Sequence, residues 1–267
     1  MSRYQNFAEV YDLFMDGVPY DRWAENITEI LSSHAVRDGL VLDLCCGTGQ
    51  MTRRLASAGY DMIGVDLSED MLSLARSSGG DGILYLHQDM RSFELYGTVR
   101  AVVSVCDSMN YLESKEELFQ VFSLVENYLD PGGLFLFDLN TAHKYRDLLG
   151  DRTFAENREE GSFIWENTYS EETGVNEFDL TFYVKEQGES YRRFEEVHLQ
   201  RSFSMREVEE MLSQASLRLL AIHDLTAQEE DPDAPMKESV CAAEAERAER
   251  VLFVAQETRK GRSSKEG

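Results

Sequence analysis

The sequence predicts an α/β fold in which helices cover both faces of a largely parallel sheet. From Leu40 to Leu139, short apolar runs typical of strands alternate with segments of helical periodicity, the pattern of a doubly wound sheet. After Asn140 the runs become rich in aromatic and β-branched residues, separated by glycine-containing turns. We therefore expect a parallel sheet followed by an antiparallel β insertion.

Local signals place the other elements. Residues 21–34 read as a helix, and Ser204 with Glu207 has the spacing of a capping box before another helix. The runs LRLLAIHDL and RVLFVAQE are expected to close the sheet as its last two strands, and the acidic segment 227–250 to form a mobile loop or short helix. This divides the 267 residues into a main domain, 1–153 and 204–258, with a helical cap at 1–36, the insertion at 154–203 and a flexible tail at 259–267.

The most informative segment is VLDLCCGTGQ, because it combines a strand with a glycine turn. Gly47 and Gly49 permit a tight turn with positive φ, and the helix expected from Thr52 onwards would point bare N–H groups at a ligand. A second apolar run ends at Asp66, where a carboxylate can accept both hydroxyls of a ribose. Together these features predict a nucleotide-type site.

The choice of cofactor depends on two residues. Thr52 stands where the dinucleotide fingerprint has a third glycine or alanine, and no Tyr-x-x-x-Lys constellation is recognisable, so a nicotinamide-dependent oxidoreductase is the weaker interpretation. Asp43 lies inside the first strand, before the glycines, where it could orient the loop or meet an amino group. A cofactor with a cationic amino-acid tail suits this position.

Five segments, in this order, carry a resemblance to a known family: DLCCGTG, GVDLSEDML, HQDMRSF, VCDSMNYL and LDPGGLFLFDLN. The region from Leu40 to Asn140 resembles the class I S-adenosylmethionine-dependent methyltransferases. The N-terminal FAEVYDLFMDGVPYDRW and the strands after Asn140 resemble a bacterial small-molecule-type subgroup. The resemblance implies a Rossmann-like seven-stranded sheet with the insertion after its fifth strand. One departure is Cys45, which replaces the family's first glycine, a position where small residues also occur.

The resemblance also implies which residues bind the cofactor. The methionyl part would lie on the turn, the ribose diol on the acid after the second strand, and the adenine between apolar neighbours and the acid after the third strand. The candidates are Tyr11, Tyr20, Trp23, Asp43, Cys45, Gly47, Gly49, Asp66, Leu67, Met71, Asp89, Met90, Cys106 and Asp107. For the N-terminal aromatic residues, whose spacing is helical, a core stripe is the alternative.

The acceptor is expected to bind after the fourth strand and beneath the insertion, with candidates Asp107, Asn110, Tyr111, Trp165 and Arg193. Two alternatives stay open: Asp107 could cap the next helix, and the insertion could be an exposed or dimer-forming sheet. No catalytic base is assignable, although His143 and His198 lie in the substrate-facing half.

The net charge and the cysteine content limit which ligands and partners we expect this chain to bind. A formal net charge of −24 disfavours nucleic acid and favours a small, even cationic, substrate. The four cysteines show no CxxC pair, so no metal is expected, and no leader or membrane-length apolar run is present, so the chain reads as cytoplasmic.

We therefore expect methyl transfer from S-adenosylmethionine to a small-molecule acceptor by direct in-line displacement, with S-adenosylhomocysteine as the other product. The alternatives are a non-catalytic S-adenosylmethionine-binding or partner-binding regulator and an NAD(P)-dependent oxidoreductase.

Overall fold

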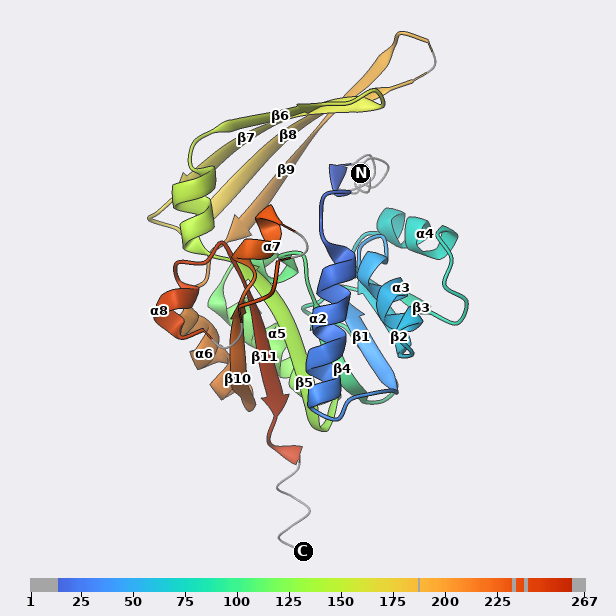
Figure 1. Ribbon diagram of the computed structural model, residues 1–267, viewed down its shortest axis with the longest axis vertical. Helices are drawn as coiled ribbons and strands as arrows, with labels where there is room; N and C mark the ends of the chain where they lie inside the picture. Colours follow the sequence, from blue (N-terminus) through green and yellow to red (C-terminus); the bar gives the residue numbers. More distant parts are fainter. Residues whose placement is uncertain (1–13, 187, 232–233, 238–239, 261–267) are drawn as a thin grey trace, which may run out of the picture.

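The computed structural model describes residues 14–186, 188–231, 234–237 and 240–260. Its centre is a seven-stranded sheet in the order β10-β11-β5-β4-β1-β2-β3 (Figure 1). The strands are β1 (Leu40–Leu44), β2 (Asp61–Asp66), β3 (Leu84–His87), β4 (Val99–Ser104), β5 (Leu129–Asn140), β10 (Leu217–Asp224) and β11 (Arg250–Glu257).

The direction of the strands confirms the predicted Rossmann-like sheet and its last two strands. β1 pairs in parallel with β2 and β4, and β4 with β5, whereas β11 runs antiparallel to both of its neighbours, β5 and β10. Parallel strands present their carboxyl ends at one edge, so the turns after β1, β2 and β4 meet there.

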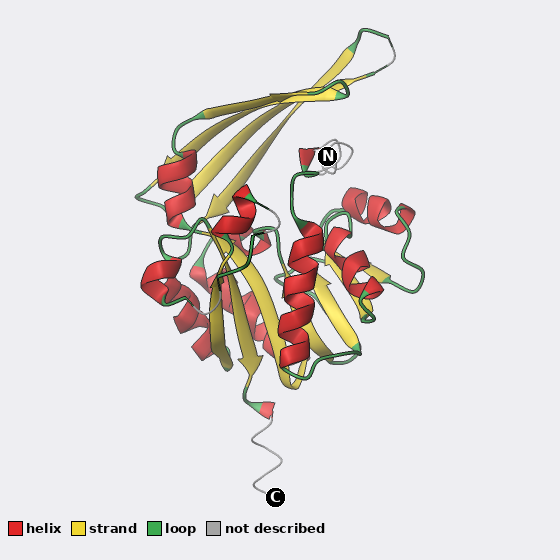
Figure 2. Cartoon of the chain, viewed as in Figure 1, coloured by secondary structure: helices red, strands yellow, loops and turns green. Residues whose placement is uncertain are grey.

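Helices cover both faces of this sheet (Figure 2). On one face α2 and α3 pack against the apolar side chains of β1 and β4, and on the other face α5 and α6 pack against Phe135, Phe137 and Phe253. The longer helices are α2 (Tyr20–Ser33), α3 (Gln50–Ser57), α4 (Glu69–Ser77), α5 (Lys115–Tyr128) and α6 (Met205–Gln214). Short turns of helix are η1 (Ser108–Tyr111), η2 (Lys144–Leu149), α7 (Thr226–Glu230) and α8 (Ala242–Ala245). No described helix is long and apolar enough to cross a membrane.

The helix ends follow the local signals in the sequence. Ser204 and Glu207 form the predicted capping box at the start of α6. Ser114 caps α5 by accepting from the backbone N–H of Glu117, so the alternative that Asp107 caps this helix is wrong. Asp107 precedes η1 without a side-chain capping bond.

The insertion is a four-stranded antiparallel sheet, which we call the lid sheet: β6 (Thr153–Asn157), β7 (Gly161–Ser170), β8 (Val175–Lys185) and β9 (Tyr191–Arg201). It rises beyond the carboxyl ends of the parallel strands (Figure 1). Alternation gives it two faces. Trp165 and Phe178 lie on the inner face, towards the main domain, whereas Ile164, Val197 and Leu199 lie on the outer face and are exposed.

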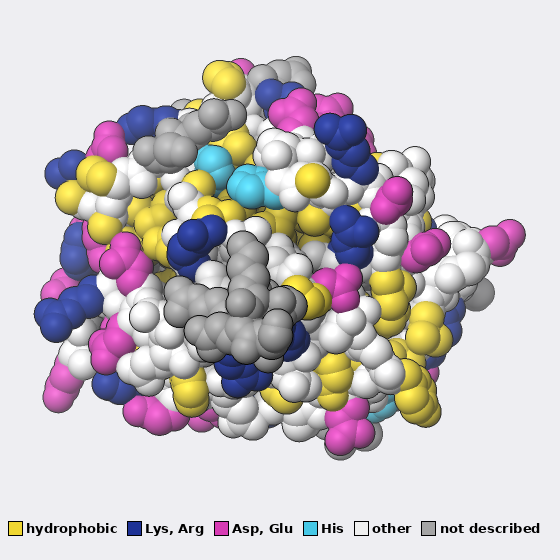
Figure 3. Space-filling view, turned by 90° about the horizontal axis from the view of Figure 1, so that it is seen from below, with side chains coloured by type: hydrophobic (Ala, Val, Ile, Leu, Met, Phe, Trp, Pro, Cys, Tyr) yellow, Lys and Arg dark blue, Asp and Glu magenta, His cyan; other side chains and the backbone are white. Residues whose placement is uncertain are grey.

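The charged surface opposite the lid sheet is mixed in sign. Acidic and basic side chains are interspersed on this face rather than gathered into separate patches (Figure 3). The end of the described chain is anchored near this face. Arg259 pairs with the buried Glu126 at 2.8 Å, and the Lys260 ammonium donates to the backbone carbonyls of Glu126, Asn127 and Leu129 at the end of α5. These two residues are therefore fixed, although they fall within the tail expected from the sequence.

The contacts of Lys260 predict a measurable effect on stability. Lys260→Met should lower the free energy of unfolding by about 1 to 2 kcal/mol, because three carbonyls at the negative end of a helix lose a cationic donor. Lys115→Met at the exposed first turn of the same helix is the control and should be neutral or slightly stabilising. Denaturant unfolding measures both, and equal losses would contradict the assignment.

Candidate functional site

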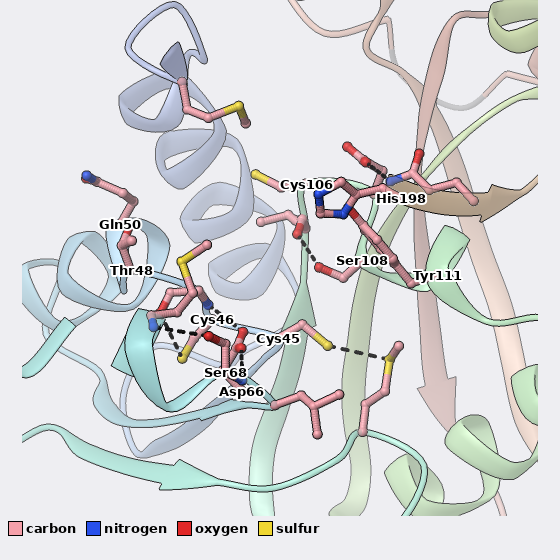
Figure 4. Close-up of a pocket in the computed structure, with 18 of the residues that line it drawn as sticks. Cys45, Cys46, Thr48, Gln50, Asp66, Ser68, Cys106, Ser108, Tyr111 and His198 are labelled. Atoms are coloured by element: carbon pink, nitrogen blue, oxygen red, sulfur yellow. Dashed lines mark hydrogen bonds between the residues drawn. The ribbon is translucent and has the colours of Figure 1, made fainter. Parts of the chain in front are cut away.

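The main cavity lies between the carboxyl ends of β1, β2 and β4 and the inner face of the lid sheet. Its volume is about 480 Å³. Asp66, Ser68, Cys45 and Cys46 surround one end, and Cys106, Tyr111 and His198 lie together at the other (Figure 4). The cavity is therefore long enough to hold two groups side by side, one against the turn after β1 and one beneath the lid sheet.

The turn after β1 is held by Asp66. The backbone N–H of Gly47 donates to one Asp66 carboxylate oxygen and that of Ser68 to the other, each at 2.8 Å. Burial raises the pKa of Asp66, while these two hydrogen bonds oppose the rise. Cys45, Gly47 and Gly49 all have positive φ, of 66°, 53° and 76°, so the turn is tightly wound. The carboxylate thus faces the cavity in a fixed position.

Asp43 lies beneath the same turn and is almost fully buried. The hydroxyl of Thr52 donates to its carboxylate at 2.5 Å, so the residue that departs from the dinucleotide fingerprint has a role of its own. Burial raises the pKa of Asp43 to about 7, against the opposing hydrogen bond from Thr52. This carboxyl group consequently changes charge near neutral pH.

Beyond Asp66 the cavity wall becomes apolar and then charged. Leu67 is 53% exposed, and Met71, Asp89 and Met90 also line the cavity. Asp89 forms an ion pair with Arg91 at 2.7 Å, and the hydrogen bonds from Arg91 lower the pKa of Asp89. Nη1 of Arg91 donates to Glu117 at 2.9 Å.

The other end of the cavity is built on two strained residues. Cys106 and Asp107 follow β4 with φ values of 64° and 51°, in the left-handed region that costs about 1 to 3 kcal/mol for a residue with a side chain. The backbone N–H of Asp107 donates to Asp138 at 2.8 Å, which helps to hold this conformation. Burial raises the pKa of the Cys106 thiol, so it is not a thiolate nucleophile at neutral pH.

Asp107 is the centre of a hydrogen-bond network that joins three parts of the fold. One of its oxygens accepts from Arg250 of β11 at 2.8 Å, and the other accepts from the Gln200 amide of β9 at 2.5 Å. Arg250 also donates to the fully buried Asp138 at 2.6 Å, and the hydroxyl of Tyr145 donates to the Gln200 carbonyl at 2.8 Å. Burial raises the pKa of Asp138, and Arg250 opposes the rise. The lid sheet is thereby tied to the parallel sheet.

Aromatic side chains and one histidine complete this end. The Tyr111 hydroxyl lies 3.2 Å from Nδ1 of His198, and the two rings meet edge to face. Trp165 and Phe178 from the lid sheet line the cavity, with ring centroids 5.1 Å apart. Tyr111, Trp165 and His198 thus line the same end of the cavity.

Other predicted site residues lie elsewhere. Asn110 is fully buried and binds the backbone of Asn140 and Arg201, so it is a structural residue rather than an acceptor ligand. Arg193 is on the outer face of the lid sheet and pairs with Glu195, because its position in β9 has the opposite phase to His198. His143 immediately precedes η2 and hydrogen-bonds Asp147 at 2.7 Å, and it is not among the described residues that line the cavity.

The N-terminal aromatic residues have mixed outcomes. Tyr20 lines the cavity, whereas Trp23 is in the core, with the Arg250 guanidinium 5.3 Å from its ring centroid. Tyr11 lies outside the described residues. Gly49 shapes the turn without lining the cavity, since a Cβ there would meet the Tyr85 hydroxyl at 2.6 Å.

Comparisons with known proteins agree with this geometry. A family model described as a methyltransferase domain matches residues 41–133. The protein YqeM of Bacillus subtilis (strain 168), a methyltransferase by name, is 40% identical over 260 residues, 96% of this chain and 98% of that protein. The crystal structure of an S-adenosylmethionine-dependent methyltransferase from Clostridium acetobutylicum ATCC 824 has a TM-score of 0.80 and 29% identity, covering 97% and 100% of the two chains. The chain belongs to the S-adenosylmethionine-dependent methyltransferases.

A further relative of this methyltransferase has a named substrate. The dTDP-3-amino-3,4,6-trideoxy-alpha-D-glucopyranose N,N-dimethyltransferase of Streptomyces venezuelae is 32% identical over 218 residues, which cover 79% of this chain and 90% of that enzyme.

The turn after β1 fits the cofactor of the family. A Cβ added at Gly47 would meet no protein atom within 4 Å, so this position opens onto free space where a ligand can approach the backbone. Asp66 faces the same space with a carboxylate that can accept from a ribose diol. The residues present are therefore compatible with S-adenosylmethionine.

Two residues that complete the site, Gln200 and Arg250, were not among the sequence candidates. Gln200 could have been found from the sequence, because side chains in a strand alternate between its two faces. In β9 this alternation puts Gln200 on the same face as His198 and puts Arg193 on the opposite face. No local pattern marks Arg250, which opens a strand that continues with an apolar run from Val251 to Ala255.

Replacing the two glycines of the turn by alanine should affect different properties of the protein. Both substitutions impose a left-handed residue, at about 1 to 2 kcal/mol. Gly49→Ala should cost more stability, since its Cβ also meets Tyr85 and Ala75, whereas Gly47→Ala should lower S-adenosylmethionine affinity more. Denaturant unfolding and calorimetric titration measure the two quantities, and the reverse ranking would contradict these roles.

The raised pKa of Asp43 predicts that cofactor binding releases a proton from this carboxyl group. A cationic amino group bound nearby would lower the pKa of Asp43 from about 7, so binding at pH 6 should release most of one proton. Because the raised pKa belongs to the free protein, affinity should rise between pH 5 and 7 and then level off. Calorimetry in buffers of different ionisation enthalpy measures the release.

Asp43→Asn is the variant for this measurement, and it should remove both the proton release and the rise in affinity. Asp147→Asn, on η2, is the control and should retain both. Proton release that persists in Asp43→Asn would assign the linkage to another group.

Proposed function

We propose that this methyltransferase transfers a methyl group, by direct in-line displacement, to a nitrogen atom of a small organic acceptor beneath the lid sheet. The observation that carries the proposal is the single cavity that runs from the turn after β1 to the inner face of the lid sheet. A ligand at one end and an acceptor at the other would meet within one cavity. No described feature favours the regulator or the oxidoreductase.

The cofactor end of the cavity is assigned residue by residue. Gly47, Cys45 and Asp43 would hold the methionyl part, with Tyr20 closing over it, and Asp66 would accept from the ribose diol. The adenine would lie between Leu67 and Met71, near Asp89 and the backbone of Met90. Asp89 is already paired with Arg91, so an adenine amino group would use the remaining acceptor capacity of this carboxylate.

The chain's task in methyl transfer is mainly alignment. When bound, S-adenosylmethionine supplies a methyl group on a positively charged sulfur. A nucleophile can attack this methyl carbon directly, because the sulfur leaves as a neutral thioether. The aromatic side chains of the lid sheet exclude water from the cavity and orient the acceptor, and such positioning can contribute about 7 to 11 kcal/mol to lowering a barrier. Nitrogen as the acceptor atom is supported by the relative from Streptomyces venezuelae, which by name is an N,N-dimethyltransferase.

The acceptor nitrogen must have lost a proton before it attacks or lose it during the step. The Tyr111 hydroxyl, which contacts Nδ1 of His198, lies at the acceptor end of the cavity. We assign this pair as the proton acceptor: Tyr111 takes the proton from the nitrogen as its own passes to Nδ1 of His198. His143 has no part in this step, since it is bonded to Asp147 and is not among the described residues that line the cavity.

The relay predicts the behaviour of three variants. With an acceptor found by screening small amines for S-adenosylhomocysteine formation, His198→Gln and Tyr111→Phe should each lower kcat by about 10²- to 10⁴-fold and change its pH dependence. The double variant should be little worse than either one, because both residues serve one transfer. His143→Gln is the matched control.

The screen itself tests the proposed function. Formation of S-adenosylhomocysteine that depends on the added amine supports it. Binding of S-adenosylmethionine without turnover of any amine would favour the regulator, and additive losses in the double variant would contradict the relay.

A further inference from the structure

The cavity is unevenly charged. Among the described residues that line it, the carboxylates outnumber the guanidinium groups by five to one: Asp43, Asp66, Asp89, Asp107 and Glu113 against Arg91. The one guanidinium is engaged by two acids, since it bonds Asp89 at 2.7 Å and Glu117 at 2.9 Å. An anionic ligand entering this space would meet like charge, whereas a cation would meet opposite charge.

The charge at the acceptor end is concentrated on one side chain. Arg250 is shared between Asp107 and Asp138, so two carboxylates have one guanidinium between them. Asp138 is fully buried and uses one oxygen for Arg250 and the other for the backbone N–H of Asp107. The side chain of Asp107 is 20% exposed and lines the cavity. The uncompensated negative charge can therefore be reached only through Asp107.

The Asp107 carboxylate is held in position by its backbone conformation and by two side-chain donors. Its backbone is held in a left-handed conformation, and its oxygens are directed by Arg250 and by Gln200, whose amide is oriented in turn by Tyr145. A carboxylate whose rotamer and backbone are both fixed loses little entropy when it binds a ligand. This arrangement suits recognition of a cation.

The opposite wall is aromatic. Phe163, Trp165, Phe178 and Phe182 lie on the inner face of the lid sheet and line the cavity, and Tyr111 of the main domain lines it too. The faces of aromatic rings attract alkylammonium cations by about 0.5 to 2 kcal/mol each, depending on desolvation. An aromatic wall facing a carboxylate is a site for an organic cation rather than for a neutral or anionic molecule.

We propose that the methyl acceptor enters as an organic amine cation that carries no phosphate group, and that Asp107 is the residue that recognises its charge. The proposal rests on the proposed function, because it names the acceptor of the same cavity. Arg250 and Gln200 are positioning residues that act through Asp107. The acceptor class therefore differs from the nucleotide-linked sugar named for the Streptomyces venezuelae relative, whose diphosphate would bring negative charge to an acidic cavity.

The test uses four probes whose shapes overlap but whose charges differ. Choline is the cation, 3,3-dimethyl-1-butanol is its neutral isostere, phosphocholine adds a phosphate, and thymidine diphosphate represents the nucleotide of the relative. Each is titrated calorimetrically into the full chain saturated with S-adenosylhomocysteine, so that the cofactor end is filled and the probe is confined to the acceptor end.

Choline should bind about tenfold more tightly than its neutral isostere, or better, because the Asp107 carboxylate adds to what one or two cation–π contacts supply. Phosphocholine should bind more weakly than choline, and thymidine diphosphate should show no binding. Equal affinities for choline and its isostere, or tighter binding of thymidine diphosphate, would overturn the proposal. This comparison needs no variant, so it cannot fail through misfolding.

The residue assignment is tested by Asp107→Asn, which preserves shape and removes charge. It should lower the preference for choline over the isostere to the part that the aromatic rings alone supply, and Gln200→Leu should lower that preference less. Asp147→Asn is the matched surface control and should leave the preference unchanged. A preference that survives intact in Asp107→Asn would assign the recognition to another group, and thermal unfolding confirms that each variant is folded.

The outcomes separate this inference from the proposed function. If S-adenosylhomocysteine does not bind, the proposed function fails before any probe is added. If it binds and choline shows no advantage, only the acceptor class is wrong, and a neutral or phosphorylated acceptor takes its place.

Discussion

The interaction on which the rest of this structure depends is the ion pair of Arg250 with two carboxylates. Asp138 is in β5, Asp107 follows β4 and Arg250 opens β11, so one guanidinium joins three strands at the carboxyl edge of the sheet. Removing Arg250 would leave two acids close together in a poorly solvated place, an arrangement that costs about 3 to 5 kcal/mol when a buried pair is broken. The network therefore contributes to the stability of the domain as well as to the shape of the site.

The lid sheet depends on the same network for its position. Its inner face is mostly apolar and aromatic, which fixes how far it lies from the main domain but little about its lateral alignment, because hydrophobic contact has no direction. The hydrogen bonds of Gln200 to Asp107 and Tyr145 are directional. They align the lid sheet laterally on the main domain, and this alignment sets the distance between the aromatic side chains of the lid sheet and the Asp107 carboxylate.

The parts of the site that the sequence predicted are those made by neighbouring residues. Gly47 and Asp66 could be assigned because a strand, a turn and a strand tip are local patterns, and in the structure the two residues do meet. The partners of Asp107 could not, since Gln200 lies 93 residues away and Arg250 143 residues away along the chain. Arg193 and Asn110 were misplaced for a related reason: composition indicates a ligand-binding segment, but strand phase and hidden backbone partners decide which side chains reach the ligand.

The place of β11 in the sheet has a consequence for how the protein is made. β11 is the last of the described strands in chain order, yet it lies between β10 and β5, so this edge of the sheet cannot close until Glu257 has been synthesised. Until then β5 is paired only with β4, and Asp107 and Asp138 lack their guanidinium, so the contacts that position the lid sheet are not yet complete. A nascent chain on the ribosome would expose an unpaired apolar strand, a state that favours aggregation and chaperone binding. Completion of the fold and completion of the acceptor site are therefore the same late event in synthesis.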